Sequence, residues 1–457
     1  MKEDLARAGL MEAIEQAGGT VSPKLRILIP PSGVRGVFVS QKDLLELQSN
    51  LEPLLSIPAQ QIITADEAMQ SDVVQRCVAK LSQEGIPVSE STVLSLFLLS
   101  ERALGSRSTW GWYLETLPKS GTGALFLNED ELSALDATPL KAAANGKLRV
   151  LHRQYSCVAD VLEAWICSHG AGTETVGFEI FKWAEFVVLS RAISLKSFAE
   201  TDGGGSSSAS ACDRALVPML DMFNHNATPS AFWAVSDDGS VLVYTSKDSK
   251  HPDAVVDDAG LVELCFSYGE KSNTEWMYEH GFVPQGNQHS TWPYLPMPSG
   301  TSEFVAIKRM WISELGISPR VDFADPESTG DGPSDHGKGH NYLNRGSLLT
   351  MCLAELDDTP GTPCADALGV VTLDPPYFCV GGGELIDDDD KLLSVPGLQK
   401  FALHQCIGQL EKSHETMSAN AMLLSEARAC AVKEYLFSEC SLLERVVASI
   451  KETALAL

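Results

Sequence analysis

The order of strand-like and helix-like segments is the feature that most limits how this chain can fold. Short aliphatic runs typical of strands lie within residues 24–64 and again within residues 231–268. Between them, from about residue 66 to 195, apolar residues recur at helical spacing. The pattern predicts a β region that encloses a helical insert.

The individual elements follow from local pattern and from turn residues. We expect strands at Leu25–Ile29, Val37–Val39, Leu54–Ile57, Ala231–Val235, Val241–Tyr244 and Leu261–Tyr268. The clearest helices of the insert are predicted at Thr92–Arg102, Asp160–Ser168 and Glu179–Ser194. A further helix is expected before these elements, ending at Gly18-Gly19.

The region after residue 300 is predicted to be largely helical, with amphipathic helices at Leu398–Leu410 and Leu442–Ile450. Proline-rich sequence near 290–300 predicts a domain boundary, which divides the chain into domains at 1–290 and 300–457. Three stretches are predicted to be loops: the low-complexity segment Asp202–Ser210 and two acidic Gly/Pro segments at 322–340 and 381–391, the second of which contains the run Asp387–Asp390.

Charge and composition exclude several classes of function. The 457 residues include 61 Asp and Glu against 34 Lys and Arg, a net charge of −27, with 44% hydrophobic and 21% charged residues. This is ordinary globular composition, so we expect a folded chain. The negative charge disfavours nucleic acid and anionic membranes and favours basic partners. Apolar stretches such as Val93–Leu99 are far shorter than the roughly 20 residues that span a bilayer, so no membrane segment is expected.

The 11 cysteines are scattered, and no two stand at Cys-x-x-Cys spacing or closer. This spacing argues against a zinc module, and we expect no metal site. Reduced thiols and the lack of a signal or transit pattern in the first 19 residues favour an intracellular protein. We expect the cytoplasm, with the nucleus and a plastid left open.

One segment with chemical potential is Leu216–Asn226, an apolar run that ends in Asp221, Asn224 and His225. It is either a buried strand or turn with satisfied polar groups, or the edge of a ligand site, because an Asn amide offers both a donor and an acceptor.

A second segment, Cys265–Glu275, contains Tyr268-Gly269 at the end of a predicted strand. Its Ser272-x-x-Glu275 pattern is a capping box and is explained by the helix that follows. Tyr268-Gly269 is not explained in this way. A third segment, Phe181–Arg191, is an apolar helix that ends in Arg191, which by itself indicates a core helix with a solvated arginine.

Taken together and in order, these segments resemble the SET-domain methyltransferases, in the branch of the Rubisco large-subunit lysine methyltransferase and the actin-histidine methyltransferase. The resemblance spans about residues 22–284. It is carried by Ser22-Pro23-Lys24-Leu25, Gly33-Val34-Arg35-Gly36, Leu94–Leu99, Trp110-Gly-Trp-Tyr113, Ser190-Arg191, Asp221-Met-Phe-Asn224-His225 and Tyr268-Gly269 followed by Lys271-Ser272-Asn273.

The resemblance implies an α+β fold with a SET-domain β core, a helical insert at about 66–195, and an all-helical C-terminal substrate-binding domain. After residue 300 the match is one of pattern only. It implies that S-adenosylmethionine binds against Gly33, Val34, Arg35, Arg191, Asp221, Asn224, His225 and His280, and that Tyr268 is the catalytic residue. Threading of the chain through a loop in this family would bring the motifs near residues 35 and 270 together.

These residue types suit methyl transfer. A lysine amine has a pKa of roughly 10.4 in water and must lose its proton before it attacks, and desolvation beside a sulfonium lowers that pKa. A tyrosine hydroxyl can orient the amine and polarise the methyl group without adding a full charge.

We therefore expect an S-adenosylmethionine-dependent protein-lysine N-methyltransferase, a monomer that acts on a locally basic, non-histone protein. Two alternatives stay open. The acceptor could be a protein histidine, since the same branch covers both. The chain could instead be a catalytically silent scaffold that binds a basic protein, because Val34 and His280 depart from the residues usual in the family.

Overall fold

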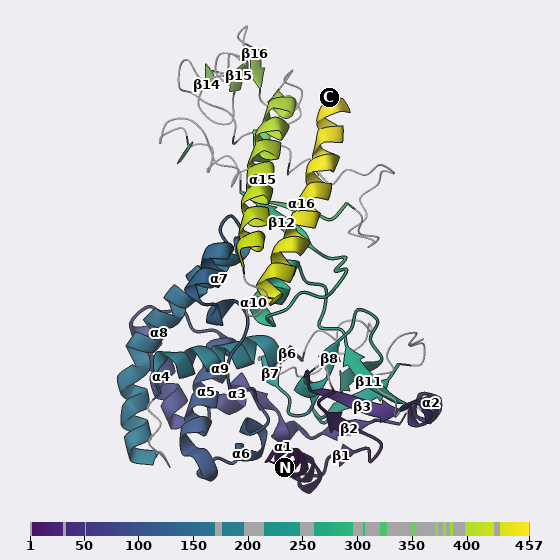
Figure 1. The fold of residues 1–457 in the computed structure, drawn as a ribbon. Helices are drawn as coiled ribbons and strands as arrows, with labels where there is room; N and C mark the ends of the chain where they lie inside the picture. Colours follow the sequence, from purple (N-terminus) through teal and green to yellow (C-terminus); the bar gives the residue numbers. More distant parts are fainter. Residues whose placement is uncertain are drawn as a thin grey trace. The chain divides into compact units, whose positions relative to one another are not determined.

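The computed structural model divides the chain into two compact units, Met1–Leu125 with Gly146–Gly269, and Phe126–Asn145 with Glu270–Leu457 (Figure 1). It describes residues 2–30, 33–50, 52–169, 176–195, 214–246, 260–295, 305–306, 320–326, 347, 350–352, 354, 371–372, 378–380, 384–386, 398–424 and 430–456. The expected loops at Asp202–Ser210 and Asp387–Asp390 lie outside the described residues. The domain boundary expected near 290–300 stays a prediction. By contacts between residues, the C-terminal part of the second unit begins at Glu270.

The β core of the first unit consists of small sheets with strands from both ends of that unit. One four-stranded sheet has the order β1-β4-β10-β9 and is antiparallel throughout. Its strands are Thr20–Val21 (β1), Leu55–Ile57 (β4), Val241–Thr245 (β10) and Ala231–Val235 (β9). Val241, Val243 and Thr245 alternate with more exposed residues along β10, which explains the period-2 pattern in the sequence.

The second sheet is the one that concerns function. Its order is β2-β3-β11-β8, formed by Arg26–Leu28 (β2), Gly36–Ser40 (β3), Leu261–Phe266 (β11) and Asn224–His225 (β8). β8 pairs with β11 in parallel, so that Asn224 lies opposite Cys265 and His225 lies opposite Phe266. The sheet therefore brings three segments distant in sequence next to one another.

The helical insert lies between these strands in sequence. Within the first unit it includes Ala65–Ala68 (α3), Asp72–Gln83 (α4), Glu90–Leu104 (α5), Gly111–Leu114 (α6), most of Pro139–His169 (α8) and Phe178–Arg191 (α9). The carboxylate of Glu185 on α9 is buried, forms an ion pair with Lys147 and accepts a hydrogen bond from Ser95 at 3.1 Å. This carboxylate joins three helices of the insert.

The predicted helix Glu179–Ser194 ends earlier than expected. α9 stops at Arg191, Ala192 is extended, and Ile193–Ser194 forms a strand (β6). β6 pairs with Arg214–Leu216 (β7), which also pairs with Ile63–Thr64 (β5). Strand pairing with a distant segment therefore overrides the local helical pattern.

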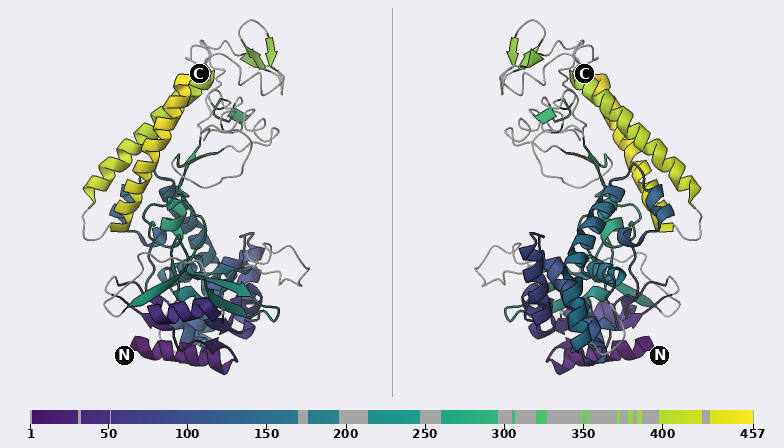
Figure 2. Two further views of the ribbon diagram at one scale, coloured as in Figure 1. Left: turned by 90° about the vertical axis from the view of Figure 1, so that its right-hand side faces the viewer. Right: turned by 90° about the vertical axis from the view of Figure 1, so that its left-hand side faces the viewer.

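In the second unit, two long helices form an antiparallel pair, Leu398–Leu423 (α15) and Cys430–Ala456 (α16) (Figure 2). Ion pairs cross between them, from Lys451 to Glu411 at 2.6 Å and from His414 to Glu444 at 3.1 Å. The predicted helices Leu398–Leu410 and Leu442–Ile450 lie inside this pair.

The second unit also contains the helices Glu129–Ala134 (α7), which lies inside the predicted helical insert, and Asn273–Glu279 (α10), which is the helix predicted to follow the Ser272-x-x-Glu275 capping box. The sequence did not predict its strands, which are Thr291–Tyr294 (β12), Val321–Ala324 (β13), Val371–Thr372 (β14), Phe378–Val380 (β15) and Glu384–Ile386 (β16). The strands mean that the region after residue 300 is not helical throughout. β13 overlaps the acidic loop predicted at 322–340, and β16 lies within the one predicted at 381–391. β13 forms a strand there because Val321 and Phe323 bury one of its faces. None of the described helices combines the length and apolar character needed to cross a membrane.

A buried carboxyl group stands out in this unit. Glu439 on α16 is fully buried, and no described residue gives its oxygens a hydrogen bond of good geometry. Burial raises the pKa of Glu439 to about 8, and the Asn273 side chain offsets part of that effect. The Glu439 carboxyl therefore keeps its proton in mildly acidic solution.

This pKa makes the stability of the fold depend on pH. Because the folded pKa exceeds the ordinary value of 4.5, the unfolded chain releases the proton first as the pH rises. The stabilisation is complete below pH 4.5 and is lost as the pH rises through 8. Relative to Glu439→Gln, we expect the wild type to lose about 1.4 kcal/mol of unfolding free energy per pH unit in this window. Urea unfolding of both proteins measures this, and a pH-independent difference would contradict it.

Candidate functional site

The turn before β3 places a backbone segment at the edge of the sheet. Gly33 has φ of +83°, a conformation that favours glycine, and its N–H donates to the carbonyl oxygen of Pro30 at 2.8 Å. Val34 follows with 58% of its surface exposed. Arg35 then leads into β3 at Gly36.

Asn224 connects this turn to the Asp221–His225 segment. Its side-chain nitrogen donates to the carbonyl oxygen of Arg35 at 2.9 Å and to Oε1 of Glu263 at 2.6 Å. Two segments that the resemblance assigns to the cofactor site are thus joined directly, although they lie 189 residues apart in sequence.

Tyr268 lies two residues after the end of β11 and beside His225. Its backbone N–H donates to Nδ1 of His225 at 3.1 Å, and the two rings are 5.5 Å apart. Its hydroxyl donates to the carbonyl oxygen of Phe223 at 2.6 Å. Burial raises the pKa of Tyr268, Arg191 opposes this shift and Asp221 adds to it. The phenol is therefore neutral at physiological pH.

Arg191 and Asp221 form a buried ion pair. Nη1 of Arg191 donates to Oδ2 of Asp221 at 3.0 Å and to the Asp221 carbonyl oxygen at 2.8 Å. The Asp221 side chain is 1% exposed. Burial by itself would lower the pKa of the Arg191 guanidinium, but the neighbouring Asp221 and Tyr113 raise it. Arg191 therefore stays charged, and it is not the solvated helix end that it would be in isolation.

A strained backbone conformation precedes Asp221. Met219 has φ of +71° and ψ of −35° although it is not glycine, and it caps the short 3₁₀ helix Leu220–Met222. Such conformations cost about 1–3 kcal/mol and persist where the surrounding structure determines them. Here the fully buried Met219 side chain anchors the turn that aims Asp221 at Arg191.

Two site residues were not identified from sequence. Tyr113 on α6 is fully buried, and its hydroxyl donates to Oδ2 of Asp221 at 3.0 Å. Burial raises the pKa of Tyr113 well above its ordinary value, and Asp221 adds to the shift. Glu263 is an acid within the apolar strand β11, and that placement was the signal available in the sequence. The partners of both residues are distant in sequence and could not be read from it.

The ion pair has atoms left over for a ligand. Nε of Arg191 and Oδ1 of Asp221 are buried and have no hydrogen-bond partner among the described residues. Such unpaired groups are costly, and they fit a ligand that presents an acceptor and a donor close together. The amino-acid end of S-adenosylmethionine, a carboxylate beside an ammonium group, has this character.

The structure brings together eight of the nine predicted site residues, in one turn and three hydrogen-bonded pairs. Gly33, Val34 and Arg35 form the turn, Arg35 and Asn224 are bonded to each other, His225 bonds to Tyr268, and Arg191 bonds to Asp221. His280 belongs to the second unit, where it caps α10 with its ring 5.1 Å from that of Trp276 and 6.1 Å from that of Phe282. The roles of all these residues stay predictions.

Comparison with known proteins supports the resemblance. No family model matches the chain. It is 28% identical over 243 residues to mouse SET domain-containing protein 4, covering 52% of this chain and 51% of the relative. It is 25% identical over 249 residues to the ribosomal lysine N-methyltransferase set10 of Schizosaccharomyces pombe, covering 53% and 40%. It is 24% identical over 351 residues to the actin-histidine N-methyltransferase of Drosophila melanogaster, covering 71% and 59%. The chain thus spans about half the length of the curated relatives it matches.

Solved structures match over nearly the whole chain. The SET domain of LSMT bound to lysine and AdoHcy aligns with a TM-score of 0.65 at 14% identity, covering 99% of this chain and 92% of that one. Rubisco LSMT bound to AdoMet aligns with a TM-score of 0.62 at 14% identity, covering 98% and 92%. The chain therefore has the SET-domain fold, with a helical C-terminal region, and the expected fold class is confirmed.

The three-way contact at Asp221 allows a test of the site's geometry. Tyr113→Phe removes one of the two donors to a buried carboxylate, so we expect the free energy of unfolding to fall by about 1.5–3 kcal/mol. Tyr155→Phe is the matched control, because its hydroxyl donates at 3.0 Å to the neutral carbonyl oxygen of Val176. That loss should be about 1 kcal/mol. Denaturant unfolding measures both losses. Equal losses would show that the hydrogen bond from Tyr113 to the Asp221 carboxylate stabilises the fold no more than one to a neutral carbonyl oxygen.

Proposed function

We propose that this chain is an S-adenosylmethionine-dependent protein N-methyltransferase that acts on a lysine of a non-histone protein. The observation that carries the proposal is the neutral Tyr268, hydrogen-bonded to the Asp221–His225 segment, to which the charged and incompletely bonded Arg191 also donates. Similarity to a ribosomal lysine N-methyltransferase and the fold shared with Rubisco LSMT support it.

The residues that would hold the cofactor are Arg191 and Asp221 through their unpaired atoms, Asn224 and His225, and the Gly33–Arg35 turn. Bound by these residues, the cofactor would supply a methyl group on a sulfonium, which would pass to the acceptor nitrogen and leave a neutral thioether.

Tyr268 contributes by position rather than by charge. Its hydroxyl hydrogen is used in the 2.6 Å bond to Phe223, so toward a substrate the oxygen can only accept a hydrogen bond. A neutral amine offers an N–H for that bond, and the bond then aims the nitrogen lone pair away from Tyr268. The amine must arrive without its extra proton, and a water-poor site favours that form.

Histidine is the alternative acceptor. The similarity to the Drosophila actin-histidine N-methyltransferase extends over 351 residues, a longer match than that to the ribosomal lysine enzyme. A neutral imidazole N–H could equally bond to the Tyr268 oxygen. A catalytically silent scaffold is the remaining alternative, for which Val34 at the turn is the supporting residue.

We also propose a cytoplasmic monomer whose substrate is locally basic. The net charge of −27 supports a basic partner, because opposite charge raises the encounter rate. The scattered cysteines, of which eight are free in the described residues, support a reducing compartment.

Transfer of labelled methyl groups to proteins of a cell extract tests the activity. We expect Tyr268→Phe to reduce labelling by about two orders of magnitude while the cofactor still raises the melting temperature. Asn224→Ala should lose both labelling and the cofactor-induced shift. Tyr155→Phe, in the helical insert, is the control and should label normally. Equal labelling by all four proteins would contradict the site, and the absence of a thermal shift in the wild type would favour the silent scaffold.

Mass spectrometry of the labelled product separates the two acceptors, since methyl-lysine and methyl-histidine residues give different fragments. Methyl-histidine as the sole product would contradict the lysine proposal and identify histidine as the acceptor.

The proposed basic substrate predicts a dependence on salt. Surface charges are screened within about 8 Å at physiological ionic strength, so we expect kcat/KM for a protein substrate to fall as salt rises from low to physiological concentration. The cofactor Kd, measured in parallel, should change much less. A kcat/KM that stays constant with salt would contradict the proposal that the negative charge of this protein attracts a basic substrate.

A further inference from the structure

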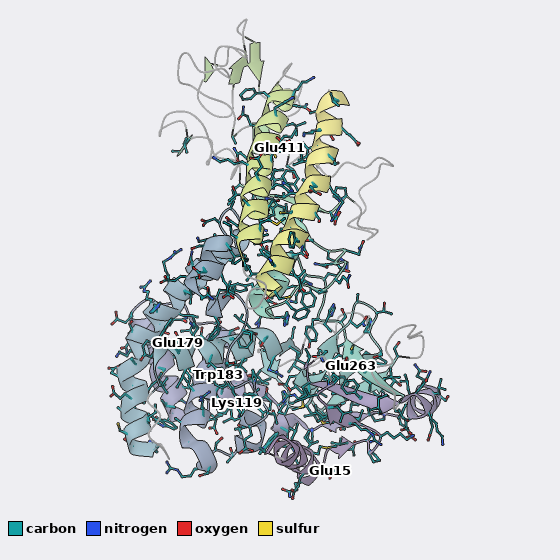
Figure 3. The ribbon with its side chains drawn as sticks, in the orientation of Figure 1. Glu15, Lys119, Glu179, Trp183, Glu263 and Glu411 are labelled. Carbon is teal, nitrogen blue, oxygen red and sulfur yellow. The ribbon has the colours of Figure 1, made fainter. Side chains whose placement is uncertain are left out.

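Glu263 lies on an inner strand of the sheet that carries the site (Figure 3). That strand, β11, pairs with β3 on one side and β8 on the other. The Glu263 carboxylate is partly buried and accepts a hydrogen bond from Nδ2 of Asn224 on β8 at 2.6 Å. An acid in a strand of otherwise apolar residues is costly unless it has such a partner.

This bond fixes which way the Asn224 amide faces. Both hydrogens of Nδ2 are used, one by Glu263 at 2.6 Å and one by the Arg35 carbonyl oxygen at 2.9 Å. A rotation of the amide by half a turn would put Oδ1 against two acceptors, which is repulsive. Oδ1 of Asn224 therefore stays on the other side, where no described residue donates to it.

The hydrogen bond between Asn224 and Glu263 lies directly against the backbone of Gly36. A Cβ atom at Gly36 would lie 2.1 Å from Oε1 of Glu263 and 3.0 Å from Nδ2 of Asn224. Gly36 is therefore required for space, since the carboxylate fills the volume that any side chain there would occupy.

We propose that Glu263 is a positioning residue of the cofactor site, which orients the Asn224 amide so that its oxygen accepts a hydrogen bond from an N–H or O–H group of S-adenosylmethionine. The inference rests on the proposed function for the identity of the ligand. Glu263 acts through Asn224 and does not itself touch the reacting atoms. Burial raises the pKa of Glu263 and the bond from Asn224 opposes that shift, which agrees with an acid held at this place by its partner.

Two variants separate positioning from bulk stability. Glu263→Gln keeps an oxygen that can accept from Asn224, so we expect the Kd for S-adenosylhomocysteine to stay within about threefold of the wild type. Glu263→Ala removes the acceptor and frees the amide, and we expect the Kd to rise by about tenfold or more. Glu101→Ala is the matched control, because Glu101 is also a partly buried acid with one short bond, from Ser108 at 2.6 Å, and its Kd should not change. Calorimetric titration well below the melting temperature of every variant gives these values.

A double variant tests the coupling to Gly36. Gly36→Ala displaces the Glu263 carboxylate and should weaken binding as Glu263→Ala does. Because both changes break the same contact, Gly36→Ala with Glu263→Ala should be little worse than either alone. Fully multiplied losses would overturn the proposal, as would wild-type affinity in Glu263→Ala or an equal loss in Glu263→Gln.

An NMR measurement without cofactor distinguishes failure of the role proposed for Glu263 from failure of the proposed function. The side-chain NH₂ proton signals of Asn224, assigned by their loss in Asn224→Ala, should both lie downfield in the wild type and in Glu263→Gln, because both hydrogens donate to oxygen atoms. One of the two signals should move upfield in Glu263→Ala, and unchanged shifts in that variant overturn the role of Glu263. A wild type that fails to bind S-adenosylhomocysteine while showing the expected shifts overturns only the proposed function.

Discussion

The buried carboxylate of Asp221 is the contact on which the site depends. Tyr113 from α6 and Arg191 at the end of α9 both donate to its Oδ2 atom. A buried charge without partners is strongly destabilising, so the first unit reaches its low free energy only when these two helical segments meet the Asp221 turn. The positive φ of Met219 is tolerated because the same contacts determine that turn. The insert is therefore a structural part of the site, since it supplies two of the three groups at its centre.

A second network joins the turn before β3 to the site by a different kind of bond. At Asp221 a carboxylate is held by cation and phenol donors, whereas at Asn224 an amide is held by a carboxylate and a carbonyl oxygen. Between them lies Tyr268, bonded through its hydroxyl to Phe223 and through its backbone to His225. The neutral phenol thus lies among fixed dipoles, an arrangement that agrees with the proposed role of Tyr268 in orienting a substrate rather than in acid or base chemistry.

The comparison of sequence and structure is informative where local and distant effects compete. Strands such as β9 and β10 were predicted nearly to the residue because one face of each is buried, and burial leaves a period-2 pattern in the sequence. The end of α9 was predicted three residues too late, because pairing of β6 with β7 is not visible locally. The strands β12 to β16 were missed because they are short and their partners lie in other segments.

The motif order in the sequence was enough to establish the fold class and to select Tyr268, Arg191, Asp221, Asn224 and His225, because the same ordered motifs mark the family that the chain resembles. Which atoms meet was decided only by the tertiary structure. Tyr113 and Asp221 are 108 residues apart, and Glu263 and Asn224 are 39 apart, so neither bond follows from periodicity or turn chemistry. Hydrogen bonds depend on distances of about 3 Å and on direction, and only the packed sheets and insert supply both.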